Sequence, residues 1–141
     1  MILLDTDHLT VLGFPDDSRH SALSGRMGAS SERMFAITVV SVAEQMRGWL
    51  AEIKRWQDVH KQIPAYDRLA KLFDFFSAWD IVPFDELAAD EFKRLRTQRI
   101  RIGTQVLKIA SMALVHDALL LSANVRDFHR VPGLRVEDWL E

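Results

Sequence analysis

Carboxylate and amide side chains follow two of the short apolar runs in this sequence. Asp5 comes directly after "MILL", with Asp7 two residues on, and Asn124 closes "ALLLSAN", with Asp127 three residues later. At the carboxyl end of a strand, such oxygens can bind a hard divalent cation such as Mg²⁺. A simpler interpretation stays open for each pair, because aspartate also caps helices and asparagine also suits left-handed turns.

Glu44 is a third candidate. It lies early in a helical stretch after "MFAIT", on the flank of that stretch's apolar stripe. A carboxylate near the core needs a partner or a metal ion, because burying it unpaired is costly. The alternative is a surface ion pair with Arg47, since residues three apart are neighbours on a helix.

Val106 stands in the first turn of a helix predicted in "GTQVLKIASMALVHD", where Gly103 permits the turn and Thr104 can cap it. A helix N-terminus favours anions, so a carboxylate in this turn could complete a metal cluster. Valine has no lone pair and can neither ligate a cation nor orient water. Either the cluster has a gap here or Val106 is an ordinary core residue.

Apolar runs alternate with longer segments of helical period, which predicts a parallel sheet with helices on its faces. In open sheets of this kind ligands gather beyond the carboxyl ends of the strands, where the candidate residues would meet. The runs are residues 1–4, 34–38, 81–84, 118–122 and "LRV" near the end of the sequence.

The clearest helix is an amphipathic one over residues 38–56. A second runs from Pro64 to Trp79, with the proline in its first turn, and a third begins after Asp85 as N-cap. We expect loops at Pro15 to Ser18 and Gly28 to Ser31.

Composition limits the classes of protein that this chain can be. Its 141 residues fit one domain, 48% of them are hydrophobic, and the absence of cysteine excludes disulfides and thiolate metal sites. The start "MILLDTDHLT" lacks the basic region of a secretory signal, and no run approaches ~18 apolar residues. We therefore expect a cytoplasmic protein.

The segment "KRLRTQRIR" carries five cations and no acid, although the net charge of the chain is -2. It is a candidate stripe for RNA phosphate contacts. The alternative is a solvated helix end whose cations interact favourably with the helix dipole. The cations are Lys93, Arg94, Arg96, Arg99 and Arg101.

Taken in order, these segments resemble the PIN domain, and in particular the VapC toxins of bacterial type II toxin-antitoxin systems. The resemblance rests on "MILLDTDHLT", "TVVSVAEQMRG", "IVPFDELAADEFKRLR" and above all "RIGTQVLKIASMALVHDALLLSANVRDFHRVPGLRVEDW". It implies an α/β fold: a PIN-like three-layer sandwich whose central, mainly parallel sheet of four or five strands is flanked by helices.

The resemblance also implies a function. Similar proteins are endoribonucleases that use Mg²⁺ or Mn²⁺ to cleave tRNA, rRNA or mRNA; a VapB-type antitoxin inhibits them, and they form homodimers. By position, Asp5 matches the first aspartate, Glu44 the glutamate and Asn124 the fourth site residue. Asp7, Thr104 and Asp127 are possible supporting residues.

The sequence departs from the family pattern at one position. After "GT" the pattern is any residue, then Asp, then Leu, whereas this chain has Gln105, Val106 and Leu107. Because a metal-binding carboxylate is missing, we predict that the metal ion is weakly bound or absent and that the chain keeps the toxin fold but loses most nuclease activity.

Two other functions remain open. The chain could be an inactive PIN domain that binds antitoxin or RNA without cutting, with a groove for an antitoxin helix on apolar residues among Leu9, Leu12, Phe14, Trp49, Leu50 and Trp56. A receiver-like phosphate-binding domain would need a lysine at the crevice. Lys108, two residues from Val106 on a helix, should point to nearly the opposite face.

Overall fold

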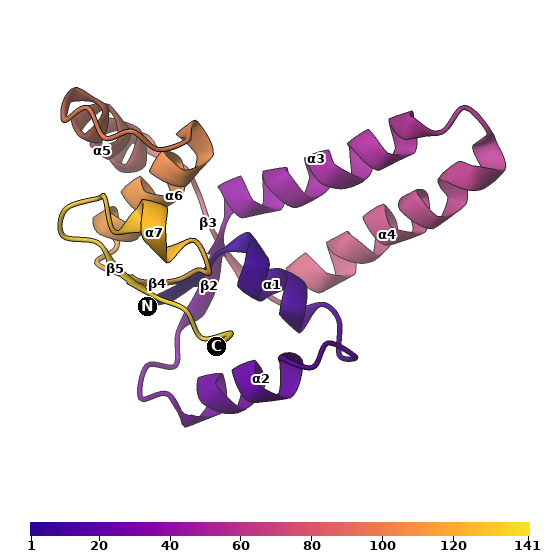
Figure 1. Cartoon of the computed structure of the whole chain (residues 1–141), viewed down its shortest axis with the longest axis horizontal. Coiled ribbons are helices and arrows are strands. Elements are labelled where there is room, and N and C mark those ends of the chain that lie inside the picture. Colours follow the sequence, from indigo (N-terminus) through magenta and orange to yellow (C-terminus); the bar gives the residue numbers. More distant parts are fainter.

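A five-stranded, fully parallel sheet organises the chain in the computed structural model, which describes residues 1–141 (Figure 1). The strand order is β3-β2-β1-β4-β5, and every neighbouring pair is parallel. The strands are β1 (Ile2–Leu4), β2 (Phe35–Thr38), β3 (Asp80–Val82), β4 (Leu119–Leu121) and β5 (Arg135–Glu137). The predicted α/β sandwich with a mainly parallel sheet is confirmed.

Seven helices connect and cover these strands. They are α1 (Thr6–Leu12), α2 (His20–Ala29), α3 (Val39–Arg55), α4 (Val59–Ser77), α5 (Glu86–Thr97), α6 (Thr104–Val115) and α7 (Val125–Phe128). None of them combines the length and the apolar character that crossing a bilayer requires.

The central strand β1 separates two cores. Leu3 faces a cluster of 15 buried residues built with α5, α6 and α7, whereas Ile2 and Leu4 face a cluster of nine built with α1, α2 and α4. Alternate side chains of a strand point to opposite faces of the sheet. Because both faces are covered, the inner strands are continuous apolar runs, as the sequence predicted.

Helices α3 and α4 pack against each other as an antiparallel arm that extends away from the sheet (Figure 1). Asp58 caps α4 by accepting a hydrogen bond from the backbone N–H of His60, so the helix begins at Val59. The prediction that Pro64 lies in the first turn is therefore wrong. Pro64 is an interior helix residue, where it cannot donate the hydrogen bond that an ordinary residue would give to the carbonyl of His60.

Two helices were not predicted. Within α2 only Leu23 is fully buried and Met27 partly so, which is too sparse to show a helical period, and Gly28 belongs to this helix rather than to the expected loop. The short helix α7 was not predicted either, since a turn at Asn124 was only one of two interpretations left open.

Two predicted caps have different outcomes. Asp85 caps α5 by accepting from the N–H of Ala88, as predicted. Thr104 does not cap α6, because the helix already includes Thr104 and the cap position is held by Gly103, without a side-chain hydrogen bond.

Substituting Leu23→Ala should lower the free energy of unfolding by about 2–5 kcal/mol, the usual range for deleting a buried leucine side chain. Leu23 is fully buried and is the only residue of α2 in the smaller core. Urea unfolding would measure the loss. Ser24→Ala, at an exposed neighbouring position, is the matched control and should change stability by less than about 0.5 kcal/mol; equal effects of the two variants would contradict this packing.

Candidate functional site

The carboxylate of Asp5 joins the ends of two neighbouring strands. As N-cap of α1, it accepts a hydrogen bond from the N–H of Thr6 at 2.8 Å through one oxygen. Its other oxygen accepts from the Ser122 hydroxyl at 2.8 Å, just beyond β4. Both interpretations left open for Asp5 thus coexist, because the residue caps a helix and points into the region beyond the strands.

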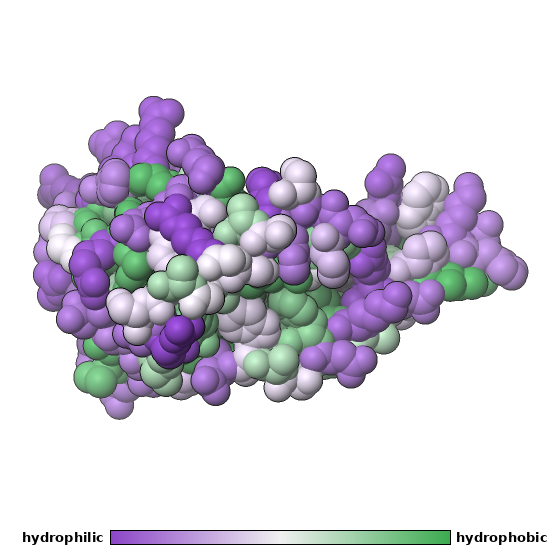
Figure 2. All heavy atoms as spheres, turned by 90° about the horizontal axis from the view of Figure 1, so that it is seen from below, coloured by the Kyte–Doolittle hydropathy of each residue, from purple (hydrophilic) through white to green (hydrophobic).

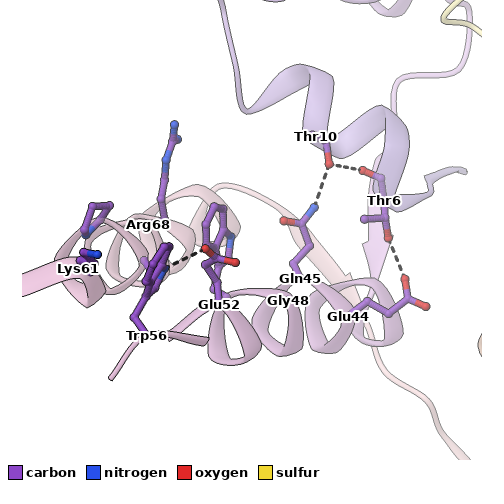
Figure 3. A pocket seen from close by; sticks show the side chains of 12 residues that line it. Thr6, Thr10, Glu44, Gln45, Gly48, Glu52, Trp56, Lys61 and Arg68 are labelled. Atoms are coloured by element: carbon purple, nitrogen blue, oxygen red, sulfur yellow. Dashed lines mark hydrogen bonds between the residues drawn. The ribbon is translucent and has the colours of Figure 1, made fainter. Parts of the chain in front are cut away.

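Glu44 reaches this region from α3. Its carboxylate accepts a hydrogen bond from the Thr6 hydroxyl at 3.0 Å (Figure 3). No ion pair joins Glu44 to Arg47 in the structure, so the alternative of a surface pair is wrong. Glu44 is half-buried and contributes negative charge beside Asp5.

Asn124 completes the cluster from the other side of Asp5. Its N–H donates to the Ser122 hydroxyl at 3.0 Å, and its side-chain amide donates to Asp127 at 3.3 Å. Asn124 is the N-cap of α7 with φ of −86°, so the left-handed turn considered for it is not formed. One chain of hydrogen bonds therefore runs from Glu44 through Thr6, Asp5 and Ser122 to Asn124.

Asp7 is held by the protein on both of its oxygens. One accepts from the N–H of His8 and lies 2.7 Å from His8 Nδ1; the other accepts from the N–H of Ala123 at 2.8 Å. His8 is fully buried, and its Nε2 accepts from the N–H of Trp139 at 3.0 Å, which leaves the ring proton on Nδ1 to be donated to Asp7. Asp7 thus supports the β4–α7 turn.

Sequence reasoning missed three residues of this network, Thr6, Ser122 and His8. The position of Ser122 directly after the apolar run "ALLL" was a usable signal, because it is the same strand-end position that singled out Asp5. His8 had no such signal. Its partner Trp139 is 131 residues away in the sequence.

The two aspartates have opposite electrostatic environments. Burial, together with the nearby charges of Asp7 and Glu44, raises the pKa of Asp5 to about 6, although hydrogen bonds from Thr6 and Ser122 oppose the shift. Burial acts on Asp7 too, but hydrogen bonds from His8 and Ala123 outweigh it and lower the pKa of Asp7. A bound cation would therefore stabilise chiefly the ionised form of Asp5, because Asp7 already has protein partners.

The oxygens present are of the kind that Mg²⁺ or Mn²⁺ prefers, but they are few. Nowhere in the chain do three histidine or acidic side chains come together in a metal-binding arrangement. Val106 lies in the first turn of α6, half-buried against the larger core, and beside it Gln105 has a buried side-chain oxygen that accepts no hydrogen bond. Two carboxylates and an amide fit a hard divalent ion poorly.

Thr104 is exposed at the start of α6. It lines a separate hollow together with Arg96, Arg99 and Arg101, and neither Thr6 nor Ser122, the residues bonded to Asp5, lines that hollow. Lys108 approaches the ring of Phe84, with its nitrogen 5.9 Å from the ring centre.

The cluster borders a groove between α1, α3 and α4. The cavity has a volume of about 740 Å³, and Thr6 and Glu44 lie at the end nearest the sheet, with Glu52, Trp56 and Arg68 farther along (Figure 3). Trp49 also lines it. A smaller hollow of about 250 Å³ continues past Trp49 to Phe14. Figure 2 shows pale and hydrophobic side chains together where the arm leaves the body, whereas hydrophilic ones cover most of its tip.

The apolar residues named as a possible groove divide into three groups. Leu9 is fully buried in the core, where it also touches the smaller hollow. Phe14, Trp49 and Trp56 line the groove and its continuation. Leu12 packs against the smaller core, and the exposed Leu50 lines neither cavity.

Curated relatives match part of the chain. It is 31% identical over 83 residues to the tRNA(fMet)-specific endonuclease VapC of Salmonella typhimurium, covering 56% of this chain and 63% of that protein. It is 34% identical over 74 residues to ribonuclease VapC2 of Rickettsia felis, covering 50% and 55%. The chain thus spans somewhat more than half the length of these relatives. No family model matches the sequence.

Solved structures match over the whole chain. The structure of VapBC-1 from nontypeable Haemophilus influenzae aligns with a TM-score of 0.73 at 22% identity, covering 100% of both chains. DNA-bound VapBC from Salmonella typhimurium aligns with a TM-score of 0.72 at 21% identity, covering 98% and 97%. VapBC2 from Rickettsia felis, bound to a promoter DNA fragment, aligns at 0.67 and 25%, covering 99% of each.

A parallel sheet in this strand order, with Asp5 directly after β1 and Glu44 on α3 near the same edge, is a PIN-like fold. Within that class, the chain is similar in sequence and in fold to the VapC proteins of VapBC toxin-antitoxin systems.

Substituting Asp5→Asn should stabilise the metal-free protein at neutral pH. The pKa of Asp5 is about 6 in the folded protein against an ordinary value of 3.8, so its favourable contribution is fully present below pH 3.8 and is lost as pH rises through 6. With EDTA present, the variant should exceed the original chain by about 1–3 kcal/mol at pH 7.5 and by much less at pH 4.5. Urea unfolding at both pH values measures this.

The control for Asp5→Asn is Asp16→Asn, which removes a carboxylate at an exposed position in the loop after α1. Its stability should follow that of the original chain at both pH values. A constant difference in stability between the Asp5→Asn variant and the original chain across this pH range would contradict the raised pKa of Asp5.

Substituting His8→Ala should cost about 2–4 kcal/mol, because it leaves a buried cavity and removes the hydrogen-bond partners of Asp7 and of the Trp139 N–H. His8→Asn can still donate to Asp7 but cannot reach Trp139, so it should cost less. Hydrogen exchange at the Trp139 amide should accelerate in both variants. Unchanged exchange would show that His8 does not fix this segment.

Proposed function

We propose that this chain is the toxin component of a VapBC-type pair, built as a metal-dependent endoribonuclease but impaired in RNA cleavage by Val106. The observation that carries the proposal is the hydrogen-bonded chain that joins Glu44, Asp5 and Asn124 from three separate parts of the sequence. The curated relatives indicate the reaction class, because they are named as an endonuclease and a ribonuclease.

The arrangement prepares oxygen ligands but leaves them one carboxylate short. In a complete site, Mg²⁺ or Mn²⁺ supplies activated water and neutralises charge at the scissile phosphate. Here Thr6 orients Glu44, and Ser122 orients Asp5. Valine in the first turn of α6 provides no oxygen, so the donors present would bind a hard cation weakly.

The groove is the proposed surface for a VapB-type antitoxin. Several structures that resemble this chain are of VapBC proteins, and another is of a toxin-antitoxin complex from Klebsiella pneumoniae. An amphipathic segment could place apolar side chains against Trp49 and Trp56, and acidic ones near Lys61 and Arg68. Homodimerisation and a cytoplasmic location, both implied by the family, belong to the same proposal.

The second candidate function is a binding module that holds antitoxin or RNA without cutting. The observation that favours it is the absence of any group of three acidic or histidine side chains able to hold a metal ion. The two candidates share the fold and the groove. They differ in the effect expected from a carboxylate at position 106: the impaired nuclease should regain RNA cleavage, whereas the binding module should not.

Substituting Val106→Asp separates them. We expect RNA cleavage dependent on Mg²⁺ or Mn²⁺ to rise at least about tenfold, because each missing interaction of a few kcal/mol in the transition state costs this much or more. Mn²⁺ binding, followed by titration calorimetry, should tighten in parallel. Without metal, the added charge beside Asp5 should lower the free energy of unfolding, and Mg²⁺ should restore it.

Val106→Asn is the matched control, because asparagine has nearly the same size and shape as aspartate but carries no charge. It should restore little cleavage. The double variant Glu44→Gln/Val106→Asp should lose the regained activity. If the original chain and Val106→Asp cut equally well, the assignment of the site is wrong. If neither cuts and both bind RNA, the binding module is the better account.

A further inference from the structure

We propose that a hollow beside the first turn of α6 is a binding subsite for the phosphate backbone of single-stranded RNA, formed by Arg96, Arg99 and Arg101. This inference rests on the proposed function, because it assigns a place on the protein to the RNA substrate. It locates a contact that is separate from the carboxylate cluster and that does not take part in cleavage.

The hollow lies between the end of α5 and the start of α6 and has a volume of about 420 Å³. Three arginines and the exposed Thr104 line it, and Phe92 and Leu107 form part of its apolar wall. All three arginine side chains belong to exposed residues. The hollow therefore combines positive charge with an apolar surface.

No carboxylate neutralises these three cations. None of the ion pairs in the structure involves Arg96, Arg99 or Arg101, and no acidic residue lines the hollow. Arg94 differs, because its guanidinium donates through two nitrogens to Glu91. The prediction of a stripe that includes Arg94 therefore narrows to the three unpaired arginines.

Contacts within the protein hold the arginine segment in place. The guanidinium of Arg96 lies over the ring of Phe92, 5.6 Å from its centre. The carbonyl of Arg101 accepts a hydrogen bond from Arg130 at 2.8 Å. Because the backbone around Arg99 and Arg101 is already ordered, less freedom is lost when a ligand binds.

The start of α6 adds to the positive potential. It is a helix of 12 residues whose cap, Gly103, has no side chain to accept from the first-turn amides. A helix N-terminus favours anions, and arginine pairs with phosphate oxygens through two parallel N–H groups. Four sources of positive potential thus converge on one concave surface.

Single-stranded RNA has the chemical groups that this surface can bind. Its phosphates need positive charge, and its unstacked bases can pack on guanidinium planes and aromatic rings such as the Arg96 and Phe92 pair. Thr104 lines the hollow, whereas Val106, two residues on in the same helix, points to nearly the opposite face and does not line it. A strand held in the hollow is therefore bound apart from the position of the missing carboxylate.

The test compares two variants that each remove two positive charges. Arg99→Asn/Arg101→Gln alters the hollow, and asparagine suits position 99, where φ is +56°. Lys54→Gln/Arg94→Gln is the control, with both positions exposed and outside the hollow. Fluorescence anisotropy of a labelled oligouridylate in EDTA measures affinity without cleavage, and circular dichroism checks folding.

We expect the hollow variant to bind the RNA about tenfold more weakly, with the slope of log affinity against log salt shallower by about 1.4, or about 0.7 for each phosphate contact. The control should stay within about twofold of the original chain. Inorganic phosphate should compete only at millimolar concentration, which would distinguish an extended backbone from a free anion.

Equal binding by the hollow and control variants would overturn the subsite, as would failure of the original chain to bind RNA while it binds polyglutamate. The proposed function is judged separately through Val106→Asp. If that variant cleaves RNA and adding Arg99→Asn/Arg101→Gln leaves its KM unchanged, the subsite is wrong and the function stands. If it cuts nothing, the failure belongs to the proposed function.

Discussion

The carboxylate of Asp5 is the interaction on which the rest of the site depends. It accepts at once from the first turn of α1 and from the residue that follows β4, so it joins a helix start to a neighbouring strand end. Parallel strands make this possible, because their carboxyl ends lie at the same edge of the sheet. The arrangement concentrates negative charge in a partly buried place, and the raised pKa of Asp5 measures the cost.

On the proposed function, that cost also explains why Val106 is compatible with an intact fold. Clustered carboxylates repel one another when no cation lies among them, so a valine at the position proposed for a further acid removes repulsion as well as a ligand. Thr6 and Ser122 donate hydrogen bonds to Glu44 and Asp5 with Val106 present. The proposed nuclease site is therefore organised but one ligand short.

Much of the fold was predictable because the sheet is buried on both faces, so its inner strands are uninterrupted apolar runs with polar residues at their ends. Asp5 and Asn124 were singled out because they follow such runs, and Glu44 because it flanks the apolar stripe of α3. Hydrogen bonds link the three residues, and their catalytic role stays a prediction. Helix α2 was not, since one buried leucine gives no periodicity, and neither was the start of α4, where the cap at Asp58 outweighs the signal of Pro64. His8 and Trp139 escaped because their contact joins distant parts of the chain.

The groove and the carboxylate cluster share two residues, Thr6 and Glu44. A molecule filling the groove would therefore touch the proposed catalytic residue Glu44, and could block access to it or replace its hydrogen bond with Thr6 without any rearrangement of the sheet. Such a molecule would act on the carboxylate cluster by direct contact, with no conformational change elsewhere in the protein. If a molecule in the groove changes the affinity of the acidic cluster for a cation, the cation must change the affinity of the groove for that molecule by the same factor.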